Sequence, residues 1–251
     1  MSRKSIGQAR EALIAADRLR RSDTHSTYDG GAWPAWQRAA VAYHLATVPD
    51  DEVWRANSDQ PALCSIEKIR ERAGKLEEAR AAVHAFPLRD TDFDQYVEQS
   101  AAAGWFHEMF RAMYPPAFWR CLDGVKSGDR TGLEPIMRFL EADPWCFRSG
   151  YVKADLIRAV IRLDLTQADR ARLRRVVLLA VDDPVLRREL RSYARLAVAV
   201  AGPGLVEALE ARLSGDSSVI RANARWILDA LAGRQLPRMS LMESARLRRP
   251  S

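Results

Sequence analysis

Seven arginines in the C-terminal part of the sequence have a spacing suited to anion binding. They recur three or four residues apart, which places each group on one face of a helix. The planar guanidinium binds phosphate and carboxylate oxygens in pairs. The pattern predicts a surface for nucleic acid or for an acidic protein segment; the alternative is a solvated face paired with acids such as Asp155 and Glu189. We call the set the arginine strip, and its members are Arg158, Arg162, Arg188, Arg191, Arg195, Arg221 and Arg225.

Histidine and carboxylate patterns give little support for catalysis. His107 and the glutamate after it begin like the HExxH helix of zinc proteases, but Arg111 stands where the second histidine is needed. The alternating carboxylates Asp90, Asp92 and Asp94 resemble the start of an EF-hand loop, but the required glycine and final glutamate are missing. We therefore expect no metal site, no cofactor and a non-enzymatic protein, with any catalytic residue unknown.

The cysteines and the apolar runs bear on the compartment. Cys64, Cys121 and Cys146 are widely separated and form no CxxC pair, which favours buried thiols in a reducing cytoplasm. No apolar run approaches the roughly 20 residues that span a bilayer. The basic start is followed by an amphipathic stretch rather than by a signal-peptide core. We expect a cytoplasmic protein that does not enter a membrane.

The net charge of +6 is unevenly distributed along the chain. Residues 1–21 and residues 234–251 each carry +4, so the body between them is slightly acidic. Within that body, residues 148–195 hold 12 Arg/Lys and 6 Asp/Glu, whereas residues 22–147 hold 13 and 20. The local basic block, which contains most of the arginine strip, therefore says more about partners than the total charge does.

Apolar residues recur at three and four spacing almost throughout, and alternating β-type runs are nearly absent. Glycine and proline clusters fall between the periodic segments. Thr166 with Asp169 fits an N-cap with an acid at N3. The pattern predicts helices at about 4–21, 32–47, 64–86, 92–113, 115–126, 131–141, 147–163, 167–181, 185–200, 203–214 and 217–232.

Three segments of the C-terminal half share one order of features. Each has an amphipathic helix, an acidic turn, an arginine five residues after the turn aspartate, and a second helix. The turn aspartates Asp143, Asp183 and Asp216 are 40 and then 33 residues apart, a period that fits one two-helix unit per repeat. The arginines that follow them are Arg148, Arg188 and Arg221.

The Asp-Pro turn followed by an apolar residue and an arginine resembles the HEAT-repeat pattern over about residues 130–233. The resemblance implies an all-α protein with a short α-solenoid of helical hairpins. It also implies that the turn aspartates and their arginines pair along the stacked repeats. The second helices, which carry the arginine strip, would then line a concave face. The pattern predicts an architecture and not an activity.

One branch of HEAT-like proteins, the alkylpurine DNA glycosylases, binds DNA on a basic concave surface. Those enzymes combine a catalytic aspartate with tryptophans around the lesion pocket. Here Trp145 and Trp226 lie near repeat turns, with Asp143 and Asp229 close by in sequence. No continuous stretch matches the wider motif of that family, so no catalytic residue is carried over.

The N-terminal half is helical without a demonstrable repeat, and forms either a cap or a separate bundle. Its aromatic residues cluster around Trp33 and Trp36, and again between Trp105 and Trp119. Helical spacing favours a hydrophobic core for these clusters; the alternative is an exposed patch for a protein partner.

The sequence as a whole predicts a binding or adaptor protein whose arginine strip holds an acidic segment of another protein. The alternative is a nucleic-acid-binding protein, including a base-excision enzyme, that uses the same strip. The predicted regions are a basic helix or arm (1–21), an irregular helical region (22–129), HEAT-like repeats (130–233) and a basic, flexible tail (234–251).

Overall fold

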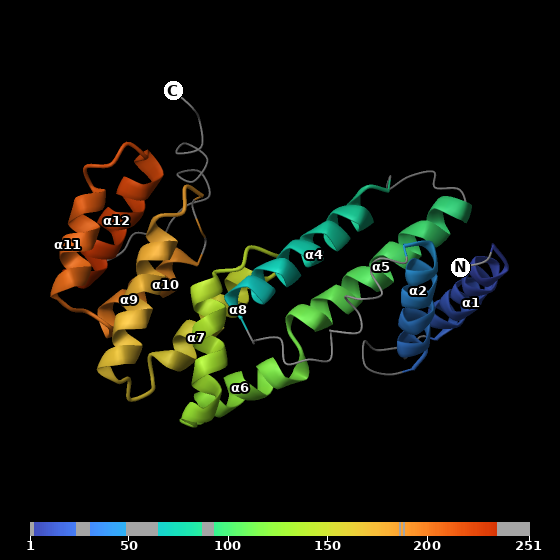
Figure 1. The fold of residues 1–251 in the computed structure, drawn as a ribbon, viewed down its shortest axis with the longest axis horizontal. Helices are drawn as coiled ribbons and strands as arrows, with labels where there is room; N and C mark the ends of the chain where they lie inside the picture. The colour runs from blue at the N-terminus through green and yellow to red at the C-terminus, as the bar shows by residue number, and fades with distance from the viewer. Residues whose placement is uncertain are drawn as a thin grey trace. The chain divides into compact units, whose positions relative to one another are not determined.

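The computed structural model describes residues 3–23, 31–48, 65–86, 93–185, 187 and 189–234. All regular structure in these ranges is helical, which confirms the all-α prediction (Figure 1). None of the described helices combines the length and hydropathy needed to cross a bilayer. The helices are α1 (Arg3–Ser22), α2 (Trp33–Thr47), α4 (Ile66–His84), α5 (Phe93–Met113), α6 (Pro116–Lys126), the 3-10 helix η2 (Arg130–Gly132), α7 (Leu133–Ala142), α8 (Ser149–Val160), α9 (Gln167–Val181), α10 (Leu190–Ala199), α11 (Pro203–Arg212) and α12 (Ser218–Leu231).

The chain divides into two compact units, and the division falls inside α6. Unit 1 comprises Met1–Trp119 and unit 2 comprises Arg120–Ser251. The predicted tail lies outside the described residues from position 235 onward, as do Cys64, Asp90 and Asp92. Of the other two cysteines, Cys121 is half-buried and Cys146 is buried, and both are free thiols.

Unit 1 is organised around α5, which packs against α1, α2 and α4. A close approach of α2 to α5 depends on Gly104, because a Cβ atom there would lie 2.2 Å from the Cβ of Ala40. Beside this crossing, the indole of Trp36 donates a hydrogen bond of 2.9 Å to the hydroxyl of Ser100. On the other flank, the buried Arg72 of α4 donates to the carbonyl oxygen of Ala112 at 3.1 Å. That oxygen lies in the last turn of α5, where carbonyls lack helical partners.

Several aromatic residues of unit 1 form its core. Trp36, Trp105 and Phe118 are buried, and the ring of Trp105 stacks on His44 at 4.4 Å between centroids. His107 lies against the rings of Trp33 and Trp36. Burial, reinforced by the charge of Arg111, lowers its pKa. The arrangement matches a hydrophobic core rather than an exposed aromatic patch.

Unit 2 contains three consecutive helical hairpins, α7–α8, α9–α10 and α11–α12. Their first helices pack in order, α7 against α9 and α9 against α11. The second helices do likewise, α8 against α10 and α10 against α12. The six helices therefore form two rows (Figure 1). The interior between the rows is filled by fully buried apolar side chains, including Phe139, Leu156, Val177, Leu196 and Leu209.

Local sequence explains several helix ends in unit 2. Thr166 and Asp169 form the predicted capping box of α9, with each side chain bonding the other's backbone N–H. Asp143 ends α7 in the left-handed region at φ 46°, a conformation that aspartate tolerates better than most residues. The structure corrects two predicted bounds: α8 ends at Val160 rather than 163, and α10 begins at Leu190 rather than 185.

Candidate functional site

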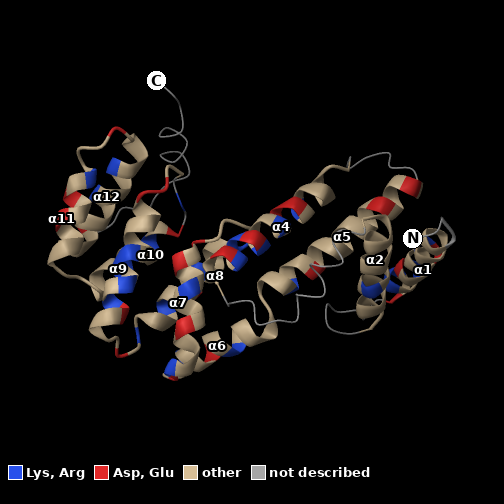
Figure 2. Ribbon diagram, viewed as in Figure 1, with Lys and Arg blue, Asp and Glu red and all other residues tan. Residues whose placement is uncertain are grey.

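The described members of the arginine strip lie on or beside the second-helix row of unit 2. Arg191 and Arg195 of α10 and Arg225 of α12 are exposed. Figure 2 colours the basic positions of these two helices blue. None of these three makes a hydrogen bond or ion pair with any residue that the structure describes. Because α10 and α12 pack against each other, these three cations lie on neighbouring helices. They form the unpaired part of the strip.

The other members of the strip behave differently. Arg158 is exposed but pairs with Asp155 on its own helix. Arg162 is exposed and lies in the turn after α8, so it does not share a helix face with Arg158 as predicted. Arg221 is half-buried and donates to two carbonyl oxygens of the preceding turn, those of residues 215 and 216. Arg188 lies outside the described residues.

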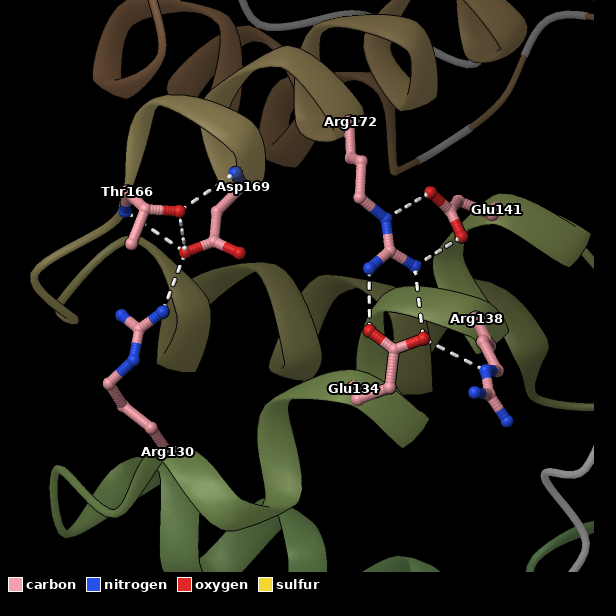
Figure 3. Close-up of polar contacts among 7 residues, drawn as sticks. All are labelled: Arg130, Glu134, Arg138, Glu141, Thr166, Asp169 and Arg172. Atoms are coloured by element: carbon pink, nitrogen blue, oxygen red, sulfur yellow. Dashed lines mark hydrogen bonds and ion pairs between the residues drawn. The ribbon is translucent and has the colours of Figure 1, made fainter.

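Most arginines of the first-helix row make hydrogen bonds or ion pairs with other described residues. Arg172 of α9 donates to both carboxylate oxygens of Glu141 at 2.7 Å, and also reaches Glu134 at 2.5 Å (Figure 3). Glu134 in turn accepts a hydrogen bond from Arg138 at 2.9 Å. These contacts join α7 to α9, which are neighbours within the first-helix row. Their geometry is the paired, forked kind that guanidinium and carboxylate favour.

A second contact between neighbouring hairpins joins η2, which precedes α7, to the start of α9. Arg130 donates to Asp169 at 2.6 Å, and Asp169 also accepts from the hydroxyl and backbone N–H of Thr166 (Figure 3). Burial alone would raise the pKa of Asp169, but these hydrogen bonds outweigh burial and hold it below its usual value. Hydrogen bonds from Arg172 similarly lower the pKa of Glu134. Both carboxylates are therefore charged and occupied at neutral pH.

The pairing continues through α9 and α11. Arg212 bonds both carboxylate oxygens of Asp182, at 2.5 and 2.6 Å. Arg170 and Arg174 donate to the carbonyl oxygens of residues 199 and 200, at the end of α10. Arg175 is the exception on α9, since it is exposed and has no partner among the described residues. Unpaired arginine is thus concentrated on α10 and α12 rather than spread over both rows.

A buried ionic cluster lies where the first two hairpins meet. Its centre is Asp143, whose Oδ1 accepts from Lys153 at 2.8 Å and from Arg187 at 2.6 Å. Lys153 is completely buried, and its Nζ also lies 3.7 Å from Glu189. Arg187 bonds Asp183 as well, at 2.5 Å. Burial would raise the pKa of Asp143, but the two cations outweigh burial and lower it.

The cluster corrects the predicted pairing of turn aspartates with arginines. Arg187, four residues after Asp183, bridges it to Asp143 of the preceding hairpin. Arg188, to which the prediction assigned this role, lies outside the described residues. Arg148 makes no ion pair with a described residue and instead lies over the ring of Phe147. It is exposed and has φ 63°, so the predicted ladder pair of Arg148 is not formed with any described residue.

Sequence analysis missed Lys153, although a pattern in α8 could have identified it. The buried positions of α8 include 149, 152, 153, 156, 157 and 160, the three-and-four spacing of a core-facing stripe. A lysine inside such a stripe has to be paired, because an unpaired buried charge is strongly unfavourable. The nearby acid that pairs with it, Asp143, was already marked as a turn residue.

The structure also describes the residues that the base-excision alternative singled out. Asp143 is engaged by two cations, so its carboxylate is not free to act as a base. Trp145 is 58% exposed and Arg187 lies 5.7 Å from its ring centroid. Trp226 is half-buried, and the nearby Asp229 pairs with Arg234. Among the described residues, no group of three or more His, Cys, Asp or Glu side chains could hold a metal ion.

The geometry therefore provides a surface in unit 2 on which several uncommitted charges lie on neighbouring helices, formed by the unpaired arginines of α10 and α12. The face of α10 that carries Arg191 and Arg195 continues, one turn further, to the exposed Val198. Such a face can contact carboxylate or phosphate oxygens and an apolar group together. Comparison with protein-family models, curated protein sequences and solved structures gave no match.

Proposed function

We propose that the chain is a binding protein that holds an acidic segment of another protein on α10 and α12. The observation that supports this most is the contrast between the two rows of unit 2. The first-helix row uses nearly all of its arginines in internal pairs, whereas Arg191, Arg195 and Arg225 have no described partner. Because these three unpaired arginines lie together on two helices that pack against each other, we assign them to external recognition.

The proposal includes a HEAT-like, solenoid-type architecture for residues 130–233. It is supported by the successive packing of α7, α9 and α11 and of α8, α10 and α12. Repeat proteins of this kind bind partners along extended surfaces built from equivalent helices. A binding role also requires no catalytic constellation, in keeping with the engagement of Asp143 in ion pairs.

The apolar position beside the arginines favours a protein segment. Val198 is 52% exposed on the same face of α10 as Arg191 and Arg195. A segment with alternating acidic and apolar side chains would contact both kinds of group. Carboxylates would bind the guanidinium groups, and apolar side chains would cover the valine.

Nucleic acid is the second candidate partner, and two exposed aromatic side chains favour it. Trp145 and Tyr151, at the turn into α8, are 58% and 74% exposed. Exposed aromatic rings near basic residues can stack on unpaired bases. Binding through phosphates would then weaken steeply with salt, in proportion to the number of phosphates neutralised.

The test compares two double variants that change the net charge equally. Arg191→Glu/Arg195→Glu alters the proposed surface, whereas Arg38→Glu/Arg175→Glu alters exposed arginines of α2 and α9 that have no described partner. Fluorescence anisotropy is measured with a labelled peptide of alternating glutamate and leucine, and with a single-stranded oligonucleotide, each at two salt concentrations.

We expect the peptide to bind the wild type and the Arg38/Arg175 variant alike, and the Arg191/Arg195 variant about tenfold or more weakly. Equal losses of peptide affinity in both variants would show that the effect depends on net charge alone, and would reject the proposed surface. Tight oligonucleotide binding with a steep salt dependence, lost only in the Arg191/Arg195 variant, would identify nucleic acid as the partner instead. Absence of binding to either ligand would reject the proposal.

A further inference from the structure

A cavity of about 440 Å³ lies in unit 1, between α1 and the first two turns of α5. This volume falls within the range of roughly 300–1,000 Å³ that is typical of small-molecule sites. The cavity belongs to the opposite part of the sequence from the arginine strip. An inference drawn from it is therefore independent of the proposed binding surface.

The lining of the cavity changes from apolar at its base to cationic at its opening. Leu13 and Val97 line it and are only 1% and 2% exposed, so they form the base. Phe93 lines it and is 54% exposed, so it lies at the opening. Arg18 and Arg21 also line the cavity and are exposed. The opening therefore combines an aromatic ring with two guanidinium groups.

The acidic residue in the lining, Asp17, is fully engaged by its neighbours. It is buried and accepts a hydrogen bond from the hydroxyl of Tyr96. Arg20 bonds its Oδ1 at 2.7 Å, and Arg21 lies 3.0 Å from its Oδ2. Burial alone would raise the pKa of Asp17, but these hydrogen bonds and charges outweigh it and lower the pKa. The carboxylate is thus ionised and neutralised, and offers little attraction to a cationic ligand.

The remaining charge at the cavity is positive. Arg18 has no partner among the described residues. Arg21 pairs with Asp17 and lies 4.4 Å from the ring centroid of Tyr96, yet its side chain stays 59% exposed. Arg18 can therefore bind an incoming anion with no internal pair broken, and Arg21 is held in place beside it by Asp17 and Tyr96. A guanidinium pair of this kind binds carboxylate well.

From this arrangement we infer that the cavity between α1 and α5 binds a small amphipathic carboxylate. The apolar body of the ligand lies against Leu13, Ile14 and Val97, where burial of its surface favours binding. Its carboxylate lies at the opening against Arg18, with Arg21 as the second cation. A neutral ligand of the same shape loses the charged contact, and a cationic one meets two like charges.

The experiment uses the full chain and three ligands with the same apolar chain: octanoate, octanol and octylammonium. Isothermal titration calorimetry measures each with the wild type and three variants. Arg18→Gln removes the free cation at the opening. Ile14→Trp fills the cavity from a half-buried lining position. Arg38→Gln makes the same charge change on α2, outside the lining, and serves as the matched control.

We expect the wild type and Arg38→Gln to bind octanoate with one site and to bind the other two ligands more weakly. Octanoate affinity should fall about tenfold or more in Arg18→Gln and be lost in Ile14→Trp. Far-UV circular dichroism verifies that each variant keeps its helices. Wild-type affinity for octanoate in both lining variants, equal affinity for octylammonium, or no binding at all would each overturn the inference.

Discussion

Replacement of Asp143 by asparagine tests the buried cluster of unit 2 most directly. Asparagine keeps the shape of the side chain and tolerates the left-handed backbone at this position, so the change removes mainly the charge. Lys153 and Arg187 would then lose their shared carboxylate while buried. Removing one partner of a buried ion pair costs about 3–5 kcal/mol. Glu189 and Asp183 still face the two cations, so we expect the free energy of unfolding to fall by about 3 kcal/mol, the lower end of this range.

Thermal unfolding followed by circular dichroism provides the measurement. For a chain of this length, a loss of about 3 kcal/mol lowers Tm by roughly 6–12 °C. Asp155→Asn is the matched control, because Asp155 forms an exposed pair with Arg158 on one helix, and such pairs contribute less than about 1 kcal/mol. If Asp143→Asn unfolds within 1–2 °C of the control (about 0.5 kcal/mol), the buried cluster does not stabilise the fold as argued.

The pH dependence of the same variant gives an independent check. The pKa of Asp143 is lower in the folded chain than in the unfolded chain, so its ionised form stabilises the fold above the unfolded pKa. That contribution is lost as the pH falls through the folded pKa. The stability difference between wild type and Asp143→Asn should therefore be complete at neutral pH and shrink below about pH 4. A difference that stays constant down to acid unfolding would contradict this assignment.

Three further substitutions test other contacts by equilibrium urea unfolding. Thr166→Ala removes the side-chain cap of α9 and should destabilise by about 1 kcal/mol; no change would mean that the cap is not formed in solution. Gly104→Val places a side chain against Ala40, where even a Cβ would lie at 2.2 Å, and should cost about 2 kcal/mol or more; a neutral result would rule out this close approach. Arg172→Lys loses the forked contact with Glu141 and should cost about 1 kcal/mol, whereas wild-type stability would show the pair to be solvated.

Local sequence patterns determined which segments form helices. The apolar periodicity, together with glycine and proline breaks, predicted each of the described α-helices to within a few residues at most ends. The capping box at Thr166 was equally predictable, since both of its partners lie within four residues of one another. The main departures are at α8 and α10, whose ends depend on how the adjoining turns pack.

Tertiary structure decided which charges remain available. Arg172 and Arg191 look alike in sequence, since both lie among arginines at helical spacing. The fold places Arg172 against Glu134 and Glu141 from another helix, more than 30 positions away, and leaves Arg191 without a described partner. Sequence spacing reports which residues share a helix face, but pairing depends on which helices become neighbours. The arginine strip was therefore predicted as seven residues. Among the members that the structure places in helices, three have no described partner.

The same distinction explains the two features that sequence analysis did not find. Lys153 was hidden because its partners Asp143 and Glu189 come from a turn and from the following hairpin. The unit 1 cavity exists only because α1 and α5, separated by about 70 residues, pack side by side. The sequence by itself thus determined an all-helical chain with a basic, repeat-like C-terminal half. Packing between distant segments decided which of its charges are buried, which are paired and which face the solvent, because each of those outcomes depends on neighbours that no local pattern specifies.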